Sequence, residues 1–350
     1  MALKRPLYIA GGGAVTSGGL DMRQTIAAIR AGLSAFAEEY LVDPFASSQL
    51  TARVPTHFHL RRNQGAWLVN LAARALAEAL RTGAAAPEES AVLISTPESF
   101  RKHPAFDDVA LNDFLPALMR QAGVKLHPAS RVIDGGAAAS IGLLERAADI
   151  LETQGASQIL LGGVDSFLNQ KDLARLRDAE RLSGSANAQG LVPGEAAVFV
   201  RITTAPASKG EVMPAIRGIG IAQENDSVLS DRASQGRGLL AALRAASASP
   251  APAEPDIAFV VSNSNGERYS GLEQLIARSR FYQTRREILA TCYPAMTIGD
   301  IGAASGALAL LIASDSLTRN YAPGPVAMCE VASEGGMRAA AAVLGMRRAA

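Results

Sequence analysis

The chain has 350 residues, of which 48% are hydrophobic and 19% are charged, and its 34 Lys and Arg almost balance its 33 Asp and Glu. This composition excludes an intrinsically disordered chain and predicts a globular protein with a large core. A net charge of +1 argues against nucleic acid or an anionic membrane as a partner. No apolar run reaches the roughly 20 residues of a membrane span.

The N-terminus and the cysteines favour a cytoplasmic protein. Two basic residues precede a short apolar run, as in a signal peptide, but glycines 11–13 interrupt that run. We therefore interpret residues 7–10 as a buried first strand followed by a turn. Cys292 and Cys329 lack the spacing of a zinc site or a disulfide framework, which fits a reducing compartment.

Residues 1–203 alternate between the patterns of strands and helices. Continuous apolar runs predict strands, and apolar residues three and four positions apart predict helices. The expected strands are 7–10, 91–96, 131–134, 157–165 and 195–204, and the expected helices are 22–33, 66–81, 108–123 and 139–155. Because the strands are apolar on both faces, the sheet should be covered on both sides, which predicts an α/β fold.

A polar link at 204–211, "TAPASKGE", precedes a second half at 212–350 in which the pattern restarts. The expected strands are 213–222, 256–262 and 325–332, the expected helices are 230–246, 269–280 and 302–314, and 248–255 is a loop. "GGAAAS" at 135–140 and "GAASGA" at 302–307 each open an alanine-rich helix. This internal echo predicts a duplication, with one unit in each half.

Four segments, in order along the chain, resemble β-ketoacyl synthases of the thiolase-like superfamily. Residues 7–36 resemble that family's opening strand, turn and helix, and "GLVPGEAAVFVRI" at 190–202 resembles its Gly-Glu-Gly-Ala strand. "TIGDIGAASGALALLIA" at 297–313 is similar to its glycine-histidine helix start, and "ASEGG" at 332–336 to its C-terminal glycine-rich turn. The resemblance implies a five-layered αβαβα fold built from two similar halves, and a dimer.

The same resemblance predicts that the catalytic positions are degenerate. Condensation needs a thiolate at a helix N-terminus and two imidazoles. The family's cysteine falls on Ala137, and its histidines fall on Asn263 and Asp300. All four histidines of the chain lie before residue 128, and both cysteines lie outside the turn at 134–139. We therefore expect no catalytic residues of this type.

Ordinary structural roles account for several of the remaining polar residues. Ser140 is a possible replacement nucleophile, but no histidine is near it in sequence, and its hydroxyl can instead bond to the helix backbone. Asp300 is expected to cap backbone N–H groups at a helix start. Asn263 and Asn265 lie in "SNSNG", which has the composition of a turn. His57 and His59 have no carboxylate or cysteine nearby in sequence, so we expect no metal site.

Glu334, Gly335 and Gly336 align with the family's gate to the acyl pocket, where a phenylalanine is common. A carboxylate there disfavours long acyl chains, because burying it unpaired is costly.

We expect no cofactor. The main hypothesis is an inactive ketosynthase-like protein that acts as an adaptor, a chaperone or a non-catalytic partner subunit. It would form a homodimer, or a heterodimer with a ketosynthase-like or other cytoplasmic protein. The alternatives are a chain-length-factor-like subunit in fatty acid or polyketide synthesis, and a weak acyltransferase or decarboxylase that uses Ser140.

Overall fold

The computed structural model describes residues 2–39, 48–55, 65–83, 85–98, 111–205, 212–230 and 232–347. The strands are β1 (Ala2–Thr16), β2 (Ala37–Glu39), β3 (Gln49–Thr51), β4 (Ser90–Ser95), β5 (Arg131–Ile133), β6 (Gln158–Ser166), β7 (Glu195–Thr203), β8 (Val212–Gln223), β9 (Phe259–Ser262), β10 (Ala290–Cys292), β11 (Val326–Ala332) and β12 (Met337–Arg347). The helices are α1 (Met22–Ala31), α2 (Gly65–Arg81), α3 (Leu111–Ala122), α4 (Ala139–Gly142), α5 (Leu144–Thr153), α6 (Gln170–Asp178), α7 (Arg237–Ala246), α8 (Arg268–Phe281), α9 (Ala295–Ile298) and α10 (Ser305–Thr318). None of these helices is long and apolar enough to cross a membrane.

Ten strands form one sheet whose two halves repeat the same topology, and β2 and β3 form a separate hairpin. In the first half, β1 is antiparallel to β7, β7 is antiparallel to β6, and β6, β4 and β5 are mutually parallel. In the second half, β8, β12, β11, β9 and β10 repeat that order and those directions. A short antiparallel contact between β1 and β8 joins the halves. The repetition agrees with the internal echo in the sequence.

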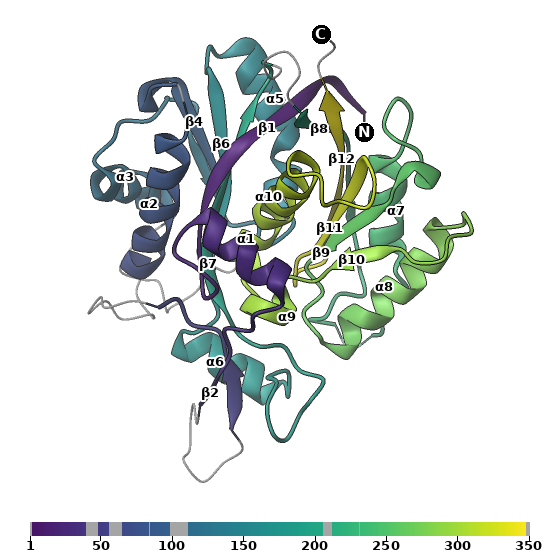
Figure 1. Cartoon of the computed structure of the whole chain (residues 1–350). Coiled ribbons are helices and arrows are strands. Elements are labelled where there is room, and N and C mark those ends of the chain that lie inside the picture. The colour runs from purple at the N-terminus through teal and green to yellow at the C-terminus, as the bar shows by residue number, and fades with distance from the viewer. Residues whose placement is uncertain are drawn as a thin grey trace.

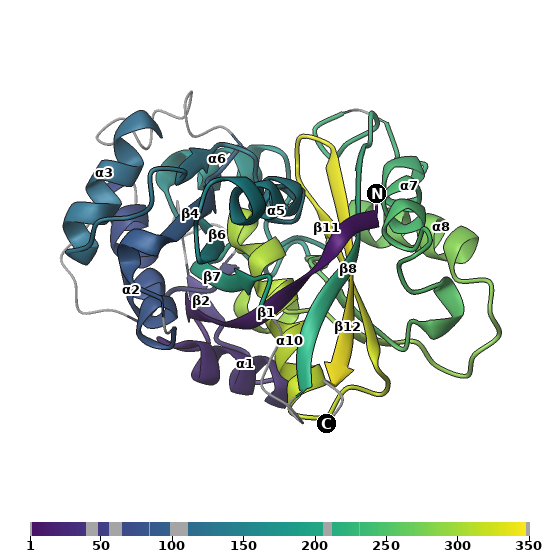
Figure 2. The same cartoon turned by 90° about the horizontal axis from the view of Figure 1, so that it is seen from above.

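The helices build layers around these two half-sheets (Figures 1 and 2). Helices α2 and α3 pack on the outer face of the first half-sheet, and α7 and α8 pack on the outer face of the second. Helices α1, α4, α5 and α10 contribute to the core between the half-sheets. The order of layers is therefore αβαβα, as the sequence predicts.

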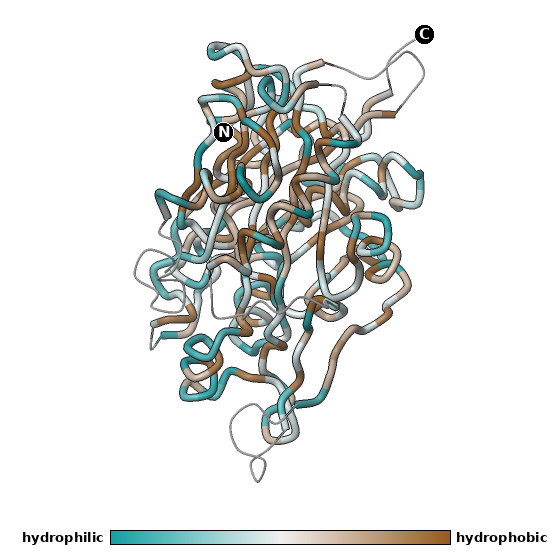
Figure 3. Tube along the Cα trace, turned by 90° about the vertical axis from the view of Figure 1, so that its left-hand side faces the viewer, coloured by the Kyte–Doolittle hydropathy of each residue, from teal (hydrophilic) through white to brown (hydrophobic). Residues whose placement is uncertain are grey.

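Helix α10 is the centre of this arrangement. Its residues from Ser305 to Ala313 are all buried, and it contacts strands of both half-sheets. A helix that is apolar on every side is stable only when it is enclosed. Figure 3 shows that hydrophobic segments gather in the interior and hydrophilic ones at the periphery.

The glycine-rich segment after residue 10 belongs to a strand, so the predicted turn there is wrong. Strand β1 continues through it to Thr16. Side chains at Gly12 and Gly13 would collide with neighbouring backbone, since a Cβ would lie 2.1 Å from Phe199 O at Gly12 and 2.2 Å from Ala75 O at Gly13. These glycines let β7 and α2 approach the strand closely.

One further expectation needs correction, and two long elements, β12 and α6, were missed. The helix predicted at 139–155 is broken into α4 and α5 at Leu143. Strand β12 was not predicted, because its run of alanines at 339–342 has low strand propensity. The strand forms because its backbone pairs on both sides, with β11 and with β8, and small side chains fit beneath the covering helices. Helix α6 was also missed.

Candidate functional site

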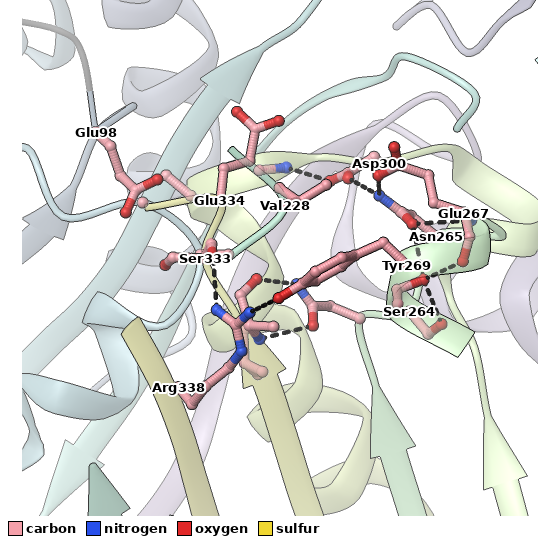
Figure 4. A pocket seen from close by; sticks show the side chains of 18 of the residues that line it. Glu98, Val228, Ser264, Asn265, Glu267, Tyr269, Asp300, Ser333, Glu334 and Arg338 are labelled. Atoms are coloured by element: carbon pink, nitrogen blue, oxygen red, sulfur yellow. Dashed lines mark hydrogen bonds between the residues drawn. The ribbon is translucent and has the colours of Figure 1, made fainter. Parts of the chain in front are cut away.

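A cavity of about 270 Å³ opens at the carboxyl ends of the parallel strands β4, β6, β9 and β11 (Figure 4). Loops that leave these strands bring residues from both half-sheets to one place. This edge is where α/β proteins commonly bind ligands, because the chain there is free to vary. The positions predicted for the catalytic triad, Ala137, Asn263 and Asp300, all line the cavity, as does Glu334.

The first turn, residues 134–139, presents a methyl group to the cavity. Gly136 has φ = 67°, a left-handed conformation that favours glycine, and Ala137 follows it with 6% of its surface exposed. The turn is held by its backbone, because Gly136 N donates to Thr96 O (3.1 Å) and Ala138 N donates to Ser333 Oγ (2.8 Å). The side chain with which this turn lines the cavity is therefore the methyl group of Ala137, which cannot attack a thioester.

The other candidate nucleophiles do not line the cavity. Ser140 is fully buried, and its side chain faces Gly306 of α10. Its Oγ has no hydrogen-bond partner in the described part of the chain, so the expected bond to the helix backbone is not made. Burial raises the pKa of Cys292 to about 11, which disfavours the reactive thiolate. Burial raises the pKa of Cys329 further, and its Sγ lies 3.4 Å from Ala309 O of α10.

Asn263 bridges two strand ends. Its Nδ2 donates to Ala332 O (2.9 Å), while its Oδ1 accepts from Ala332 N (2.9 Å). The side-chain amide of Asn263 therefore extends the pairing of β9 with β11 by one residue past Ser262, the last residue of β9. Asn265 makes the turn that its sequence predicts, since its Oδ1 accepts from Glu267 N (3.2 Å). Its Nδ2 donates to Asp300 Oδ2 (2.8 Å), which links the loop after β9 to the turn at 299–304.

The second turn, residues 299–304, contains the partly buried Asp300 and packs against the buried Asp165. Asp300 Oδ1 accepts from Gly302 N (3.0 Å), the capping role predicted from the sequence. Asp165, at the end of β6, accepts from Ala303 N through Oδ2 (2.8 Å) and from Ser166 N through Oδ1 (2.8 Å). Gly302 has φ = 47°, and a Cβ there would lie 2.1 Å from Asp165 Oδ2. The turn thus requires glycine at the point where the carboxylate of Asp165 packs against it.

Burial changes the acidity of both carboxylates. Burial raises the pKa of Asp300 to about 6, although the hydrogen bonds from Asn265 and Gly302 act in the opposite direction. Burial also raises the pKa of Asp165 well above its usual value, and the charges of Asp172 and Asp300 add to this effect. In the described residues neither Asp165 nor Asp300 has an ion-pair partner, so only N–H groups stabilise their charges.

Charged side chains form a connected network beside the cavity. Arg181 donates to both carboxylate oxygens of Glu267 (2.6 and 2.9 Å) and to Glu334 Oε1 (2.6 Å). Arg175 of α6 donates to Glu334 Oε2 (3.0 Å) and contacts Asp172. The charge of Glu334, which would be costly if it were buried unpaired, is compensated by these two arginines. Figure 4 shows Glu267, Asn265 and Asp300 linked in a row.

A second, deeper ion pair closes the floor of the cavity. Arg338 and Glu273 are 1% and 2% exposed, and Arg338 Nε lies 3.0 Å from both carboxylate oxygens. The Arg338 guanidinium also donates to Ser333 O (2.7 Å) and to Tyr269 Oη (3.1 Å), as Figure 4 shows. Gly335 and Gly336 form the tight turn between β11 and β12, in which Gly335 N donates to Glu98 Oε2 (2.8 Å).

The chemistry available in the cavity follows from these side chains. No cysteine, histidine or lysine lines it in the part of the chain that the structure describes. No group of three or more His, Cys, Asp or Glu among those residues could hold a metal ion. His57 and His59 lie outside the described residues. The polar groups of the described lining are carboxylates, arginines, amides and the hydroxyls of four serines and Tyr269, which suits binding by hydrogen bonds and charge.

Neither a protein-family model nor a curated protein sequence matches the chain. Solved structures do match over nearly its whole length. A ketosynthase in complex with its chain length factor from Xenorhabdus doucetiae is 16% identical, with 98% of each chain covered and a TM-score of 0.75. The ishigamide ketosynthase/chain length factor is 17% identical, with 97% of this chain and 99% of that chain covered and a TM-score of 0.70.

A third match is a type II polyketide synthase acyl-carrier protein in complex with its ketosynthase bound to the hexaketide. It is 14% identical, with 98% of this chain and all of that chain covered and a TM-score of 0.74. At these identities the likeness establishes the fold. The chain has the thiolase-like fold of the ketosynthases and chain length factors.

The sequence missed most of the charged residues around the cavity. Asp165 was detectable, because it directly follows an apolar strand at the edge where ligand sites form. The local sequence gives no sign that the three arginines take part in a site. Arg181 and Arg338 pair with carboxylates at least 65 residues away, and Arg175 lies on α6, a helix that was not predicted.

Proposed function

We propose that this protein is a non-catalytic subunit of ketosynthase fold that works by pairing with an active ketosynthase. The observation that carries the proposal is the lining of the cavity. Ala137, Asn263 and Asp300, to which the resemblance assigns the positions of the thiolate and the two imidazoles, line the same cavity. Serine hydroxyls and Tyr269 also line the cavity, but in the described chain none of them donates to a carboxylate or an imidazole that could act as its base, which supports the absence of acyl transfer.

The electrostatics of the cavity support the same proposal. The condensation substrate is an anionic malonyl thioester whose enolate gains negative charge as it forms. Stabilising that enolate requires hydrogen-bond donors or cations aimed at it. Asp165 and Asp300 instead place two carboxylates at the second turn, and neither has an arginine or lysine ion-pair partner in the described chain. Their ionised forms would repel an enolate.

The kind of partner is proposed from the solved neighbours. Two of them are ketosynthases paired with a chain length factor, which is a subunit of the same fold. A chain that has this fold without the condensing residues matches the second member of such a pair. The ion-pair network at Glu334 would then contribute to the shape of the complex rather than to a reaction.

The alternative enzyme that uses Ser140 has less support. Its hydroxyl is fully buried against α10 and lies outside the cavity lining. A serine nucleophile needs a base in hydrogen-bond contact, and Ser140 Oγ has no partner in the described chain.

The test is to co-express this chain with ketosynthases from its source organism and to assay the purified species. We expect one ketosynthase to elute with the chain as a single complex that condenses malonyl and acyl carriers. Replacing the ketosynthase's own nucleophilic cysteine with alanine should abolish turnover, while Ser140→Ala in this chain should leave it unchanged. Separate elution from every ketosynthase, with recovery of an unrelated protein instead, would support the adaptor or chaperone role and overturn the pairing proposal.

A further inference from the structure

Ion pairs occupy much of the inward face of helix α8. Glu273 is 2% exposed and forms the ion pair at the floor of the cavity, and Arg278 Nε donates to Glu330 Oε1 (2.6 Å). Ala277 and Phe281 are the apolar residues of α8 that are buried. A helix that covers a sheet normally turns its apolar stripe toward that sheet. The polar inward face of α8 therefore leaves its other apolar side chains to lie elsewhere.

Three apolar side chains lie on the solvent side of α8 instead. Leu275 is 67% exposed, Leu272 is 40% exposed, and Ile276 is partly exposed. Residues three and four positions apart lie on one side of a helix, so these three form one row, which we call the α8 stripe. Figures 1 and 2 place α8 at the outer edge of the second half. The neighbouring α7 has the usual arrangement, with its leucines buried, namely Leu239, Leu240 and Leu243.

The exposed charges on α7 and α8 are all positive. Arg268 lies one turn before the α8 stripe and Arg280 one turn after it, and both are exposed, as are Arg237 and Arg244 on α7. None of these four arginines has an ion-pair partner in the described chain. Neither helix offers an exposed carboxylate, because α7 has no acidic residue and Glu273 is the only one in α8. Uncompensated cations therefore border the apolar row.

This combination of an apolar row and positive charge selects the kind of partner. A row one residue wide matches the ridge of another helix better than a flat surface. Arginines at both ends favour carboxylates on that helix. A second copy of this chain docked face to face would bring the same arginines together, and like charges repel. A lipid surface would require a wider apolar face than three side chains.

We propose that the outer face of α8 binds an acidic amphipathic helix of a partner protein. The apolar residues of that helix pack on the α8 stripe, and its carboxylates pair with Arg268 and Arg280. The proposal depends neither on the missing catalytic residues nor on pairing with a ketosynthase. Pairing can therefore fail while this docking succeeds, and the reverse.

Photo-crosslinking of the full chain in cells of its source organism identifies what covers the α8 stripe. The photoreactive residue p-benzoylphenylalanine replaces Leu275, and in the control it replaces Leu33, which is 65% exposed on the loop after α1. We expect the probe at 275 to form an adduct with one protein, which mass spectrometry maps to an amphipathic helix whose exposed charges are mostly carboxylates. An adduct with lipid, with a second copy of this chain or with a basic segment would overturn the proposal, as would no adduct beyond the control.

Affinities then test the chemistry of the contact. A labelled synthetic peptide with the sequence of the crosslinked helix is titrated with the purified chain, and fluorescence polarisation reports binding. Leu272→Ser and Leu275→Ser should each weaken binding about tenfold, and Arg268→Gln combined with Arg280→Gln should weaken it about threefold at low salt. All four side chains are exposed, so these changes carry little risk to folding. Leu33→Ser is the matched control and should bind as the wild type does.

Two results would contradict the assignment. Equal peptide affinity of Leu275→Ser and Leu33→Ser would show that the α8 stripe is not the docking site. Unchanged affinity of the double arginine variant would show that the partner is not recognised by its acidic residues.

Discussion

The first turn (134–139) and the second turn (299–304) enter the same cavity from the two repeated halves, and they have diverged in chemistry more than in shape. Each contains a left-handed glycine, Gly136 or Gly302, with a carboxylate packed where a Cβ would lie. Each leads into helices of the central layer. The first turn lines the cavity with the methyl group of Ala137, and the second lines it with the partly buried carboxylate of Asp300. Packing of the central helices is sufficient reason to keep these backbone shapes, and catalysis is not required.

The largest expected effect is a loss of stability on replacing Gly302, which should exceed the loss on replacing Gly136. Gly302→Ala would place a Cβ 2.1 Å from Asp165 Oδ2 in a rigid, fully buried surrounding, and we expect a loss of about 3 kcal/mol in the free energy of unfolding. Gly136→Ala would meet Glu98 Cγ at 2.5 Å, but that side chain is partly exposed and can move. We expect a loss of about 1–2 kcal/mol there. Urea denaturation measures both, and an equal or larger loss at Gly136 would contradict the comparison.

These two turns also show what the sequence can predict. The glycine-alanine pattern indicates a tight turn before a central helix, because left-handed backbone and close packing need small residues wherever they occur. The pattern does not show what packs against the turn. Asp165 meets Gly302, and Glu98 meets Gly136, only through the fold. Strand β12 was missed for the same reason, since its alanines pair because β8 and β11 flank them.

Removing the carboxylate beside the second turn should lower the free energy of unfolding more than removing the one beside the first turn, as for the two glycines. Asp165→Ala leaves Ala303 N without its acceptor in the core, and we expect a loss of about 2 kcal/mol. Glu98→Ala frees Gly335 N near the surface, where water replaces the acceptor, so a loss below about 1 kcal/mol is expected. Thermal and urea denaturation at pH 7 should agree on this order. A more stable Asp165→Ala protein would show that its buried charge costs more than its hydrogen bonds contribute.

Asp300 in the second turn should make the stability of the protein depend on pH. Because the pKa of Asp300 is about 6 in the folded chain and near 4 when unfolded, the folded state holds an extra proton between these values. The free energy of unfolding should therefore fall as pH rises from 4 to 6, by on the order of 1–2 kcal/mol, relative to Asp300→Asn. Asp178→Asn, on an exposed part of α6, serves as the control and should titrate like the wild type. A difference curve that is flat or that rises with pH would refute this assignment.

The smallest expected effect concerns the first turn. Ala137→Cys restores a thiol at the nucleophile position, and the change of one side-chain atom should alter the free energy of unfolding by less than about 1 kcal/mol. No histidine lines the described cavity to assist the thiol or to hold an enolate, so we expect no condensation and no malonyl decarboxylation. Turnover in a carrier-based assay would mean that the cavity retains more catalytic machinery than its described lining includes.

Intact-mass spectrometry of the purified wild-type chain, after incubation with acyl and malonyl thioesters, tests the central claim most directly. We expect an unchanged mass and unconsumed malonyl thioester, because the described lining has no cysteine or histidine and none of its serine or tyrosine hydroxyls donates to a carboxylate that could activate it. A stoichiometric acyl adduct that maps to a residue of the cavity would contradict this expectation.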